Sequence, residues 1–134
     1  MQICRYRAPE VLAGWSSYGY SVDMWALGCI LVELINRAPL FPGSDSLKQL
    51  EKIVAILGKP EQSFINKCLK YSYRYNAYTM FIDSLMSVIL IHTSFIYRRF
   101  LQALPSMPAR MFKELVPNAS MDALDLAERY YVFY

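Results

Sequence analysis

Three cysteines and one histidine are the sulfur and imidazole side chains with which this chain could bind zinc or pair a thiol nucleophile with a base. Cys4, Cys29, Cys68 and His92 lie far apart in the sequence, without the short spacings of a zinc site. The odd number of cysteines argues against a disulfide framework and fits a reducing compartment. His92 has no second ligand or acidic partner in view, so we expect it to be structural and we expect no metal site.

The charged residues do not form a nucleic-acid-binding pattern. The 134 residues carry a formal net charge of +3, and the basic residues occur as short scattered pairs such as Arg5 with Arg7 and Arg98 with Arg99. A nucleic-acid partner normally requires a basic stripe or cluster, so we expect none here. The first residues contain charges without an apolar run behind them, and we therefore expect no signal peptide.

Residues 22–35 predict a buried helix. Nearly all of them are apolar, and they cover every face of a helix rather than one stripe. Ser21 is a good N-cap, Asp23 places a negative charge in the first turn, and Arg37 and Pro39 then stop the helix. With about fourteen apolar residues this helix is short for a membrane span, so we expect it at the centre of a globular core.

The next helix is predicted to follow directly. Ser44 or Ser46 could be its N-cap, and Ser46 could form a capping box with Gln49. Gly58 and Pro60 are expected to end it. Leucine and other aliphatic residues recur at spacings of three and four and give this helix one apolar face: Leu47, Leu50, Ile53, Val54 and Leu57.

Five stretches of this sequence, taken in order, resemble the substrate-side half of a protein kinase catalytic domain, and specifically the mitogen-activated protein kinases. The A-P-E triplet within Y-R-A-P-E resembles the last of the conserved sequence motifs of kinases. The run S-V-D-M-W-A-L-G-C-I-L-V-E-L-I is similar to the central helix of the large lobe. The resemblance covers residues 6–68 and 98–133. It rests on residues 6–12, 21–35, 39–60, 104–108 and 117–126.

The resemblance implies an all-α fold, namely part of a kinase large (C-terminal) lobe without the small lobe, the catalytic loop and the final helices. We expect residues 1–68 to hold the end of the activation segment, the central helix and the helix after it. Residues 98–134 are expected to hold the helical insert typical of the family and its following helix. Residues 69–97 have a different composition and are either an insertion or a retained intron.

The implied parent activity is transfer of the γ-phosphoryl group of ATP to a serine or threonine that precedes proline, with Mg²⁺ as the metal ion. The glycine-rich loop, the strand lysine, H-R-D and D-F-G do not occur in this sequence. We therefore expect no catalytic, ATP-binding or metal-binding residue in this chain and no kinase activity from it alone. Protein substrates and upstream kinases are the implied partners, and the cytoplasm or the nucleus is the implied location.

Residues Tyr6, Arg7, Ala8, Pro9 and Glu10 match the end of the activation segment. In the family the arginine helps to bind the phosphotyrosine of the activation lip and shapes the pocket for the proline of the substrate; the alternative for Arg7 is an ordinary solvated arginine. The glutamate of the family pairs with an arginine between the last two helices. This sequence contains no residue that matches that arginine, so we expect Glu10 to lack its partner.

Asp23, Trp25 and Gly28 match structural residues of the central helix. In kinases the aspartate is buried and accepts hydrogen bonds from the catalytic loop; the alternative is a first-turn aspartate that serves its own helix. Without that loop we expect the Asp23 carboxylate to turn toward solvent, because an unpaired buried charge would cost several kcal/mol, on the order of the whole stability of a small domain.

Leu12, Leu47 and Leu50 match positions of an apolar groove that binds docking motifs of substrates. Ser46 occupies a position where relatives usually have an aromatic residue. A leucine stripe of this kind can equally be core, and the sequence leaves both interpretations open.

The last helix is expected to begin after Ser120 as N-cap, with Asp122 in its first turn. Its inner side is predicted to comprise Ala123, Leu124, Leu126 and Ala127. Tyr130 and Tyr131 replace the methionine and leucine of the family, and we expect them to crowd a core.

Three other interpretations stay open. The chain could be a non-catalytic module that binds kinase docking peptides, or a gene-model fragment with no role of its own. It could also be a small membrane protein, because Met80 to Tyr97 is apolar enough to suggest a span. Asp83 and His92 within that stretch would be costly in a bilayer, so we expect no membrane association.

Overall fold

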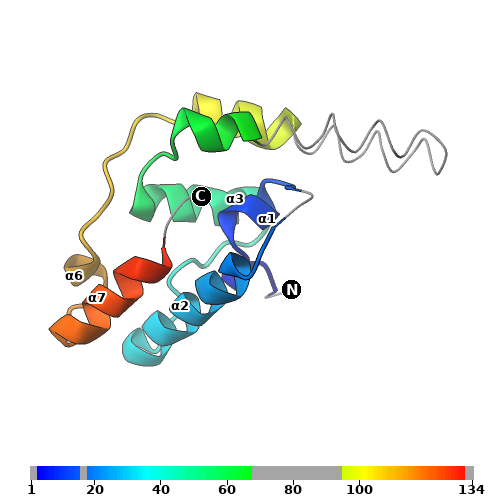
Figure 1. The fold of residues 1–134 in the computed structure, drawn as a ribbon. Coiled ribbons are helices and arrows are strands. Elements are labelled where there is room, and N and C mark those ends of the chain that lie inside the picture. The colour runs from blue at the N-terminus through cyan, green and yellow to red at the C-terminus, as the bar shows by residue number, and fades with distance from the viewer. Residues whose placement is uncertain (1–2, 16–17, 68–94, 132–134) are drawn as a thin grey trace.

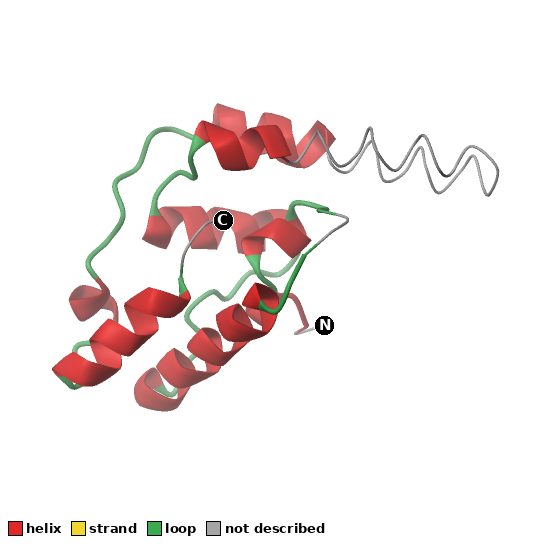
Figure 2. Cartoon of the chain, in the orientation of Figure 1, coloured by secondary structure: helices red, strands yellow, loops and turns green. Residues whose placement is uncertain are grey.

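The computed structural model describes residues 3–15, 18–67 and 95–131. These residues form helices joined by loops and contain no strand, which confirms the all-α fold (Figure 2). Residues 62–67 and 95–103 are helical. The other elements, in chain order, are the 3₁₀ helix η1 (Ile3–Tyr6), α1 (Pro9–Leu12), α2 (Ser21–Asn36), α3 (Ser46–Leu57), α6 (Phe112–Leu115) and α7 (Met121–Tyr130).

The helices pack in two groups around two hydrophobic clusters (Figure 1). Helix α2 packs against α7 and η1, and α7 also contacts α6. Helix α3 packs against α1 and η1, and the helical residues 62–67 and 95–103 lie beside each other above it. The predicted division at residues 69–97 falls almost wholly outside the described residues and stays a prediction.

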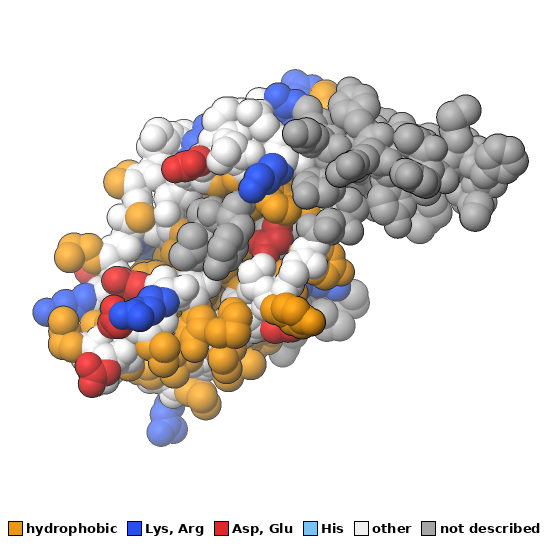
Figure 3. Space-filling model, in the orientation of Figure 1, with side chains coloured by type: hydrophobic (Ala, Val, Ile, Leu, Met, Phe, Trp, Pro, Cys, Tyr) orange, Lys and Arg blue, Asp and Glu red, His pale blue; other side chains and the backbone are white. Residues whose placement is uncertain are grey.

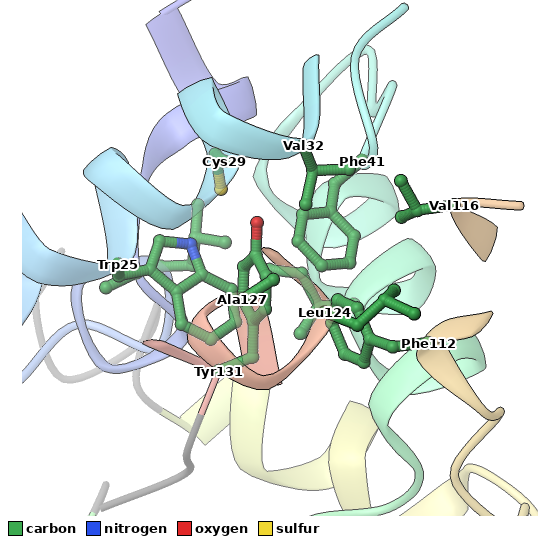
Figure 4. Packing of buried hydrophobic residues seen from close by; sticks show 12 residues of the cluster. Trp25, Cys29, Val32, Phe41, Phe112, Val116, Leu124, Ala127 and Tyr131 are labelled. Atoms are coloured by element: carbon green, nitrogen blue, oxygen red, sulfur yellow. The ribbon is translucent and has the colours of Figure 1, made fainter. Parts of the chain in front are cut away.

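Four aromatic rings form the centre of the first cluster, which we call the aromatic core: Trp25, Phe41, Phe112 and Tyr131 (Figure 4). Tyr131 meets the other three, with ring centroids 5.1 Å from Trp25, 5.7 Å from Phe41 and 5.1 Å from Phe112. These separations are in the range at which aromatic pairs stabilise each other. The second cluster is smaller and comprises Ala13, Leu50, Val54, Phe64, Ile65 and Leu101.

Helix α2 has the predicted extent but a different start. It begins at Ser21 itself, and the residue before it, Tyr20, already has helical backbone angles and provides no side-chain cap. The predicted cap at Ser21 is therefore wrong, because a residue inside the first turn cannot reach the free amides as a cap does. Arg37 ends the helix in the left-handed conformation, with a φ of 56°, and donates its N–H to the Glu33 carbonyl.

Helix α3 is capped by an aspartate and not by a serine. The Asp45 carboxylate accepts a 2.9 Å hydrogen bond from the Lys48 backbone N–H, so the predicted caps at Ser44 and Ser46 are wrong. An aspartate is as good a cap as a serine, and Asp45 is the residue with extended backbone angles. The helix ends at Gly58 as predicted, where a φ of 85° favours glycine.

The prediction that α2 is buried on all sides is wrong. Trp25, Gly28, Cys29 and Val32 are buried, and a second group of apolar residues on this helix is exposed: Met24, Leu27, Ile30 and Leu34. The described residues cover only the side of α2 that faces α7 and η1. Helix α2 is therefore apolar on both sides and packed on one.

Helix α7 largely follows its prediction. The Ser120 hydroxyl accepts a hydrogen bond from the Ala123 N–H, which confirms the cap, and Leu124 and Ala127 are buried. Leu126 is wrong as an inner residue: 43% of it is exposed, because it lies about 200° around the helix from Leu124.

The prediction that Tyr130 and Tyr131 crowd the core is wrong, because Gly28 on α2 leaves room for them. A Cβ atom at Gly28 would lie 2.7 Å from the Tyr130 Cβ and 3.3 Å from the Tyr131 ring.

The stretch that suggested a membrane span, Met80 to Tyr97, lies outside the described residues except for its last three. Among the helices that the structure describes, none combines the length and the apolar character needed to cross a bilayer.

Candidate functional site

The segment Tyr6 to Glu10 is held against the central helix by a hydrogen bond. The Tyr6 hydroxyl donates to the Glu33 carboxylate of α2 at 2.6 Å. This hydrogen bond, more than burial, raises the pKa of Tyr6, because loss of the proton would place two negative charges together. The contact joins the predicted activation-segment end to α2 across 27 residues of sequence.

Within this segment one side chain faces solvent and the residues after it are buried. Arg7 is exposed, and Ala8 and Pro9 are buried. Pro9 begins α1, where its missing N–H costs nothing, and it keeps Ala8 extended, with a ψ of 150°. The Arg7 guanidinium makes no ion pair or hydrogen bond with a residue of the described ranges. The arrangement presents a cationic group to solvent from a fixed backbone.

Glu10 is buried, with 4% of its surface exposed. Burial raises the pKa of its carboxyl, and hydrogen bonding by its own backbone N–H lowers that pKa in part. No lysine or arginine of the described residues pairs with it. The expected lack of a cationic partner for Glu10 stays a prediction, and so does the family's role for this residue.

The three residues predicted to be structural in α2 lie in different surroundings. Asp23 is exposed in the first turn, which is the position that we expected for its carboxylate. Trp25 is 2% exposed in the aromatic core, and its indole N–H has no hydrogen-bond partner among the described residues. Gly28 lies at the crossing of α2 and α7, where there is no space for a Cβ atom. Trp25 and Gly28 thus fix α7 against the central helix.

The three leucines of the predicted docking groove do not lie in one groove. Leu12 is buried in the first cluster and Leu50 is buried in the second, with exposed fractions of 3% and 0%. Leu47 is partly exposed on α3. Burial at this level places Leu12 and Leu50 in the core, so a docking surface here stays a prediction that depends on Leu47.

Gln49 is a residue of this region that the sequence analysis interpreted wrongly. It does not form a capping box; it is fully buried and accepts a 2.9 Å hydrogen bond from the Gly43 N–H. Its side-chain amide donates to the Arg5 carbonyl at 3.1 Å. Gln49 therefore connects α3 to the backbone just before Tyr6. A polar residue within the apolar face of a helix was the available signal for such a role.

No metal-binding or nucleophilic arrangement accompanies these residues in the described ranges. There, no three side chains of histidine, cysteine, aspartate and glutamate gather closely enough to hold a metal ion. Burial raises the pKa of the Cys29 thiol to about 12, so Cys29 stays protonated at neutral pH. Cys4 lies 3.9 Å from the Ser46 hydroxyl, whereas Cys68 and His92 are outside the described residues.

Comparison with known proteins places this sequence among the protein kinases. The pattern of the protein kinase domain matches residues 3–120. Mitogen-activated protein kinase p38a of Drosophila melanogaster is 36% identical over 124 residues, which are 92% of this chain and 27% of that protein. The mitogen-activated protein kinase homolog NTF6 of Nicotiana tabacum is 39% identical over 128 residues, or 96% of this chain and 28% of the relative.

A third relative, mitogen-activated protein kinase HOG1 of Wallemia sebi, is 36% identical over 92% of this chain and 36% of its own length. The chain therefore spans about a quarter to a third of the length of the curated relatives that it matches.

Proposed function

This chain belongs to the protein kinase family and is a mitogen-activated-protein-kinase-like part of the kinase domain, and from this premise we propose that it supplies the substrate-side part of the large lobe. In this proposal the parent enzyme phosphorylates serine or threonine before proline, in the cytoplasm or the nucleus. The residues that carry the role are Tyr6 to Glu10 together with α2.

The hydrogen bond between Tyr6 and Glu33 carries this proposal. It joins the Tyr6 side chain to α2 while the neighbouring Arg7 stays exposed. An exposed guanidinium on a rigid backbone can form paired hydrogen bonds with a phosphate group, which supports binding of the phosphotyrosine of the activation lip.

Binding of a phosphotyrosine peptide tests this role. We expect weak, saturable binding of such a peptide to the 134-residue chain, with backbone NMR shifts centred on Arg7. The Arg7→Ala variant should lose the binding, and Arg110→Ala, which removes another exposed arginine, should not. Equal binding by both variants would show that the peptide recognises general positive charge, and the proposed role of Arg7 would then be wrong.

We further propose that the chain alone does not transfer phosphate. Phosphoryl transfer needs groups that hold ATP, Mg²⁺ and the attacking hydroxyl, and the motifs that provide them do not occur in these 134 residues. ATP and Mg²⁺ therefore belong to the parent kinase in this proposal. Purified chain, incubated with labelled ATP, Mg²⁺ and a peptide containing Ser-Pro, should give no labelled peptide, whereas an intact mitogen-activated protein kinase gives a strong signal. Labelled peptide above background would contradict the proposal.

A second candidate function is a non-catalytic module that binds docking peptides of kinase partners. The partial exposure of Leu47 beside the buried Leu50 favours it. A leucine-containing docking peptide should then form a saturable complex that weakens on Leu47→Asp and is unchanged by Leu126→Asp on α7. If instead the chain is a gene-model fragment with no role, no stable protein of this size should be found in cells.

A further inference from the structure

The loop of residues 104–111, which we call the strap, connects the two hydrophobic clusters. It leaves the helical residues 95–103 and leads into α6, and Figure 1 shows it running along one side of the molecule. Leu104 and Met107 pack against the second cluster, whereas Phe112, directly after the strap, lies in the aromatic core. Side chains of both kinds, charged and apolar, are exposed on the surface seen in Figure 3. The strap itself contains no helix, so its position depends on what it contacts.

Backbone hydrogen bonds fasten the strap to the C-terminal end of α3. The Arg110 N–H donates to the Ile56 carbonyl at 2.7 Å, and the Lys59 N–H donates to the Met107 carbonyl at 3.4 Å. Gly58 lies so close to the strap that a Cβ atom there would be 3.0 Å from the Met107 carbonyl oxygen. Two residues of the strap are prolines, which have no N–H to donate, so few further backbone contacts are available to it.

The side chain of Lys59 adds two hydrogen bonds at the start of the strap. Its ammonium group donates to the Leu104 carbonyl at 2.7 Å and to the Gln102 carbonyl at 3.0 Å. Hydrogen bonds from a charged donor are stronger than those between neutral groups. No aspartate or glutamate of the described residues forms an ion pair with Lys59. In that part of the chain the two carbonyls are therefore the partners of the ammonium group.

Two helix ends meet at this ammonium group. Lys59 is the second residue after α3, and the carbonyls that it binds lie at the C-terminal end of the helical residues 95–103. The C-terminal end of a helix carries a partial negative charge, because its last carbonyls have no partner within the helix. A cation beside both ends is therefore favourable, and a neutral side chain would leave the two carbonyls without this donor.

We propose that Lys59 is the catch of a conformational device: its ammonium group holds the strap on the end of α3, and loss of its charge opens the strap while both hydrophobic clusters stay folded. The opening is local, because the residues that the strap adds to the second cluster, Leu104 and Met107, are only partly buried. The device does not depend on the kinase function proposed above. Release of the strap and loss of phosphotyrosine binding at Arg7 are separate results, because Arg7 lies on a different element.

Trypsin digestion tests the catch, since trypsin cleaves after Arg110 within the strap. The initial rate of this cleavage, followed by mass spectrometry, reports the fraction of chains in which the strap is open. Lys59→Met should raise the rate about tenfold, because the closed strap loses two charge-assisted hydrogen bonds. Lys52→Met removes an exposed lysine of α3 and is the matched control, which should change the rate less than about twofold. An unchanged rate in Lys59→Met would overturn the catch.

Cleavage after Arg37, which follows α2, is the internal reference in the same digests. Its rate should be the same in Lys59→Met and in the starting chain, because the aromatic core stays folded when the strap opens. Equal acceleration of cleavage after Arg37 and after Arg110 would show that Lys59 stabilises the whole chain. That result would overturn the local device.

Hydrogen exchange of the unaltered chain provides a test that needs no variant. The Arg110 N–H is bonded to the Ile56 carbonyl, whereas the Ala109 N–H has no partner among the described residues. After correction for intrinsic rates, the Arg110 amide should therefore exchange at least about tenfold more slowly than the Ala109 amide. Lys59→Met should reduce this protection. Equal exchange of the two amides in the unaltered chain would overturn the closed strap, whether or not the variant folds.

Discussion

Helices α2 and α3 are the two longest helices with described ends, and they differ in how many of their apolar faces are buried. In α3 the buried residues lie at helical spacing on one face, and the charged residues Glu51 and Lys52 are exposed on the other. In α2 apolar residues cover both faces, yet only the face toward α7 and η1 is packed. Pattern alone therefore identifies the buried face of α3, whereas the buried face of α2 depends on which neighbours are present.

The two isoleucines Ile53 and Ile30 test this difference directly. Ile53 on α3 is fully buried, and Ile53→Ala should lower the free energy of unfolding by about 2–5 kcal/mol through lost burial and a cavity. Ile30 on α2 is 46% exposed, and Ile30→Ala should cost less than about 1 kcal/mol. Urea denaturation followed by circular dichroism, at concentrations low enough to keep the chain monomeric, measures both.

Equal losses for the two isoleucines would mean that the outer face of α2 is covered in the monomer. The comparison between the helices would then fail.

The packed face of α2 should be as sensitive as that of α3, and Gly28→Ala tests this. The added Cβ would lie 2.7 Å from the Tyr130 Cβ, so α2 and α7 would have to move apart. We expect a net loss of about 1–2 kcal/mol, since overpacking costs more than the helix propensity gained from alanine. Gly19→Ala is the control, because a Cβ there meets nothing within 4 Å. A stabilised Gly28→Ala chain would show that α7 does not pack closely on α2.

Much of this fold could be predicted from the sequence, because helix periodicity and helix-ending residues are local. The extents of α2 and α3, the Gly58 end and the Ser120 cap follow from neighbouring residues alone. The exposure of Leu27 and Leu34 could not be predicted in this way, since it is decided by residues distant in sequence. The cap of α3 was missed because Ser44, Asp45 and Ser46 are all good caps, and only the backbone angles select Asp45.

The candidate site was predictable to a similar degree. The residue order alone identifies the Y-R-A-P-E segment. It does not predict the hydrogen bond from Tyr6 to Glu33 or the one from Gln49 to the Arg5 carbonyl just before the segment. Both partners lie on helices far along the chain, and neither has a local sequence signal that points to residues 5 and 6. Resemblance located the segment, and tertiary packing determined what holds it.

Buried polar groups in the two packed regions also differ. Gln49 on α3 has partners for both ends of its amide. The Tyr131 hydroxyl, which follows α7 and points toward Cys29 of α2 in Figure 4, has only that weakly hydrogen-bonding thiol beside it among the described residues. Tyr131→Phe should therefore raise the free energy of unfolding by about 1 kcal/mol, because it removes a desolvated hydroxyl and keeps the ring contacts. Thermal denaturation measures the change. A destabilised Tyr131→Phe chain would indicate that the hydroxyl has a partner such as a buried water.

Glu10 on α1 is another buried polar group whose side-chain partners can be tested. Helix α1 packs against α3. Burial raises the pKa of the Glu10 carboxyl above the ordinary value of 4.5, so the folded chain holds this proton more tightly than the unfolded chain. Stability should fall as the pH rises from 4.5 through the raised pKa, and Glu10→Gln should remove this loss. We expect Glu10→Gln to be about 0.5–1 kcal/mol more stable than the starting chain at pH 7 and equal to it below pH 4.5.

Urea denaturation at pH 4 and pH 7 measures this difference, with the exposed Glu128→Gln as the matched control that should show no comparable pH dependence. A less stable Glu10→Gln chain at pH 7 would mean that a cation pairs with the carboxylate. That result would make Glu10, like Gln49 on α3, a buried polar residue whose side chain has its partners. A gain at pH 7 that disappears in acid would instead identify Glu10 as a buried charge that the described helices leave without a partner.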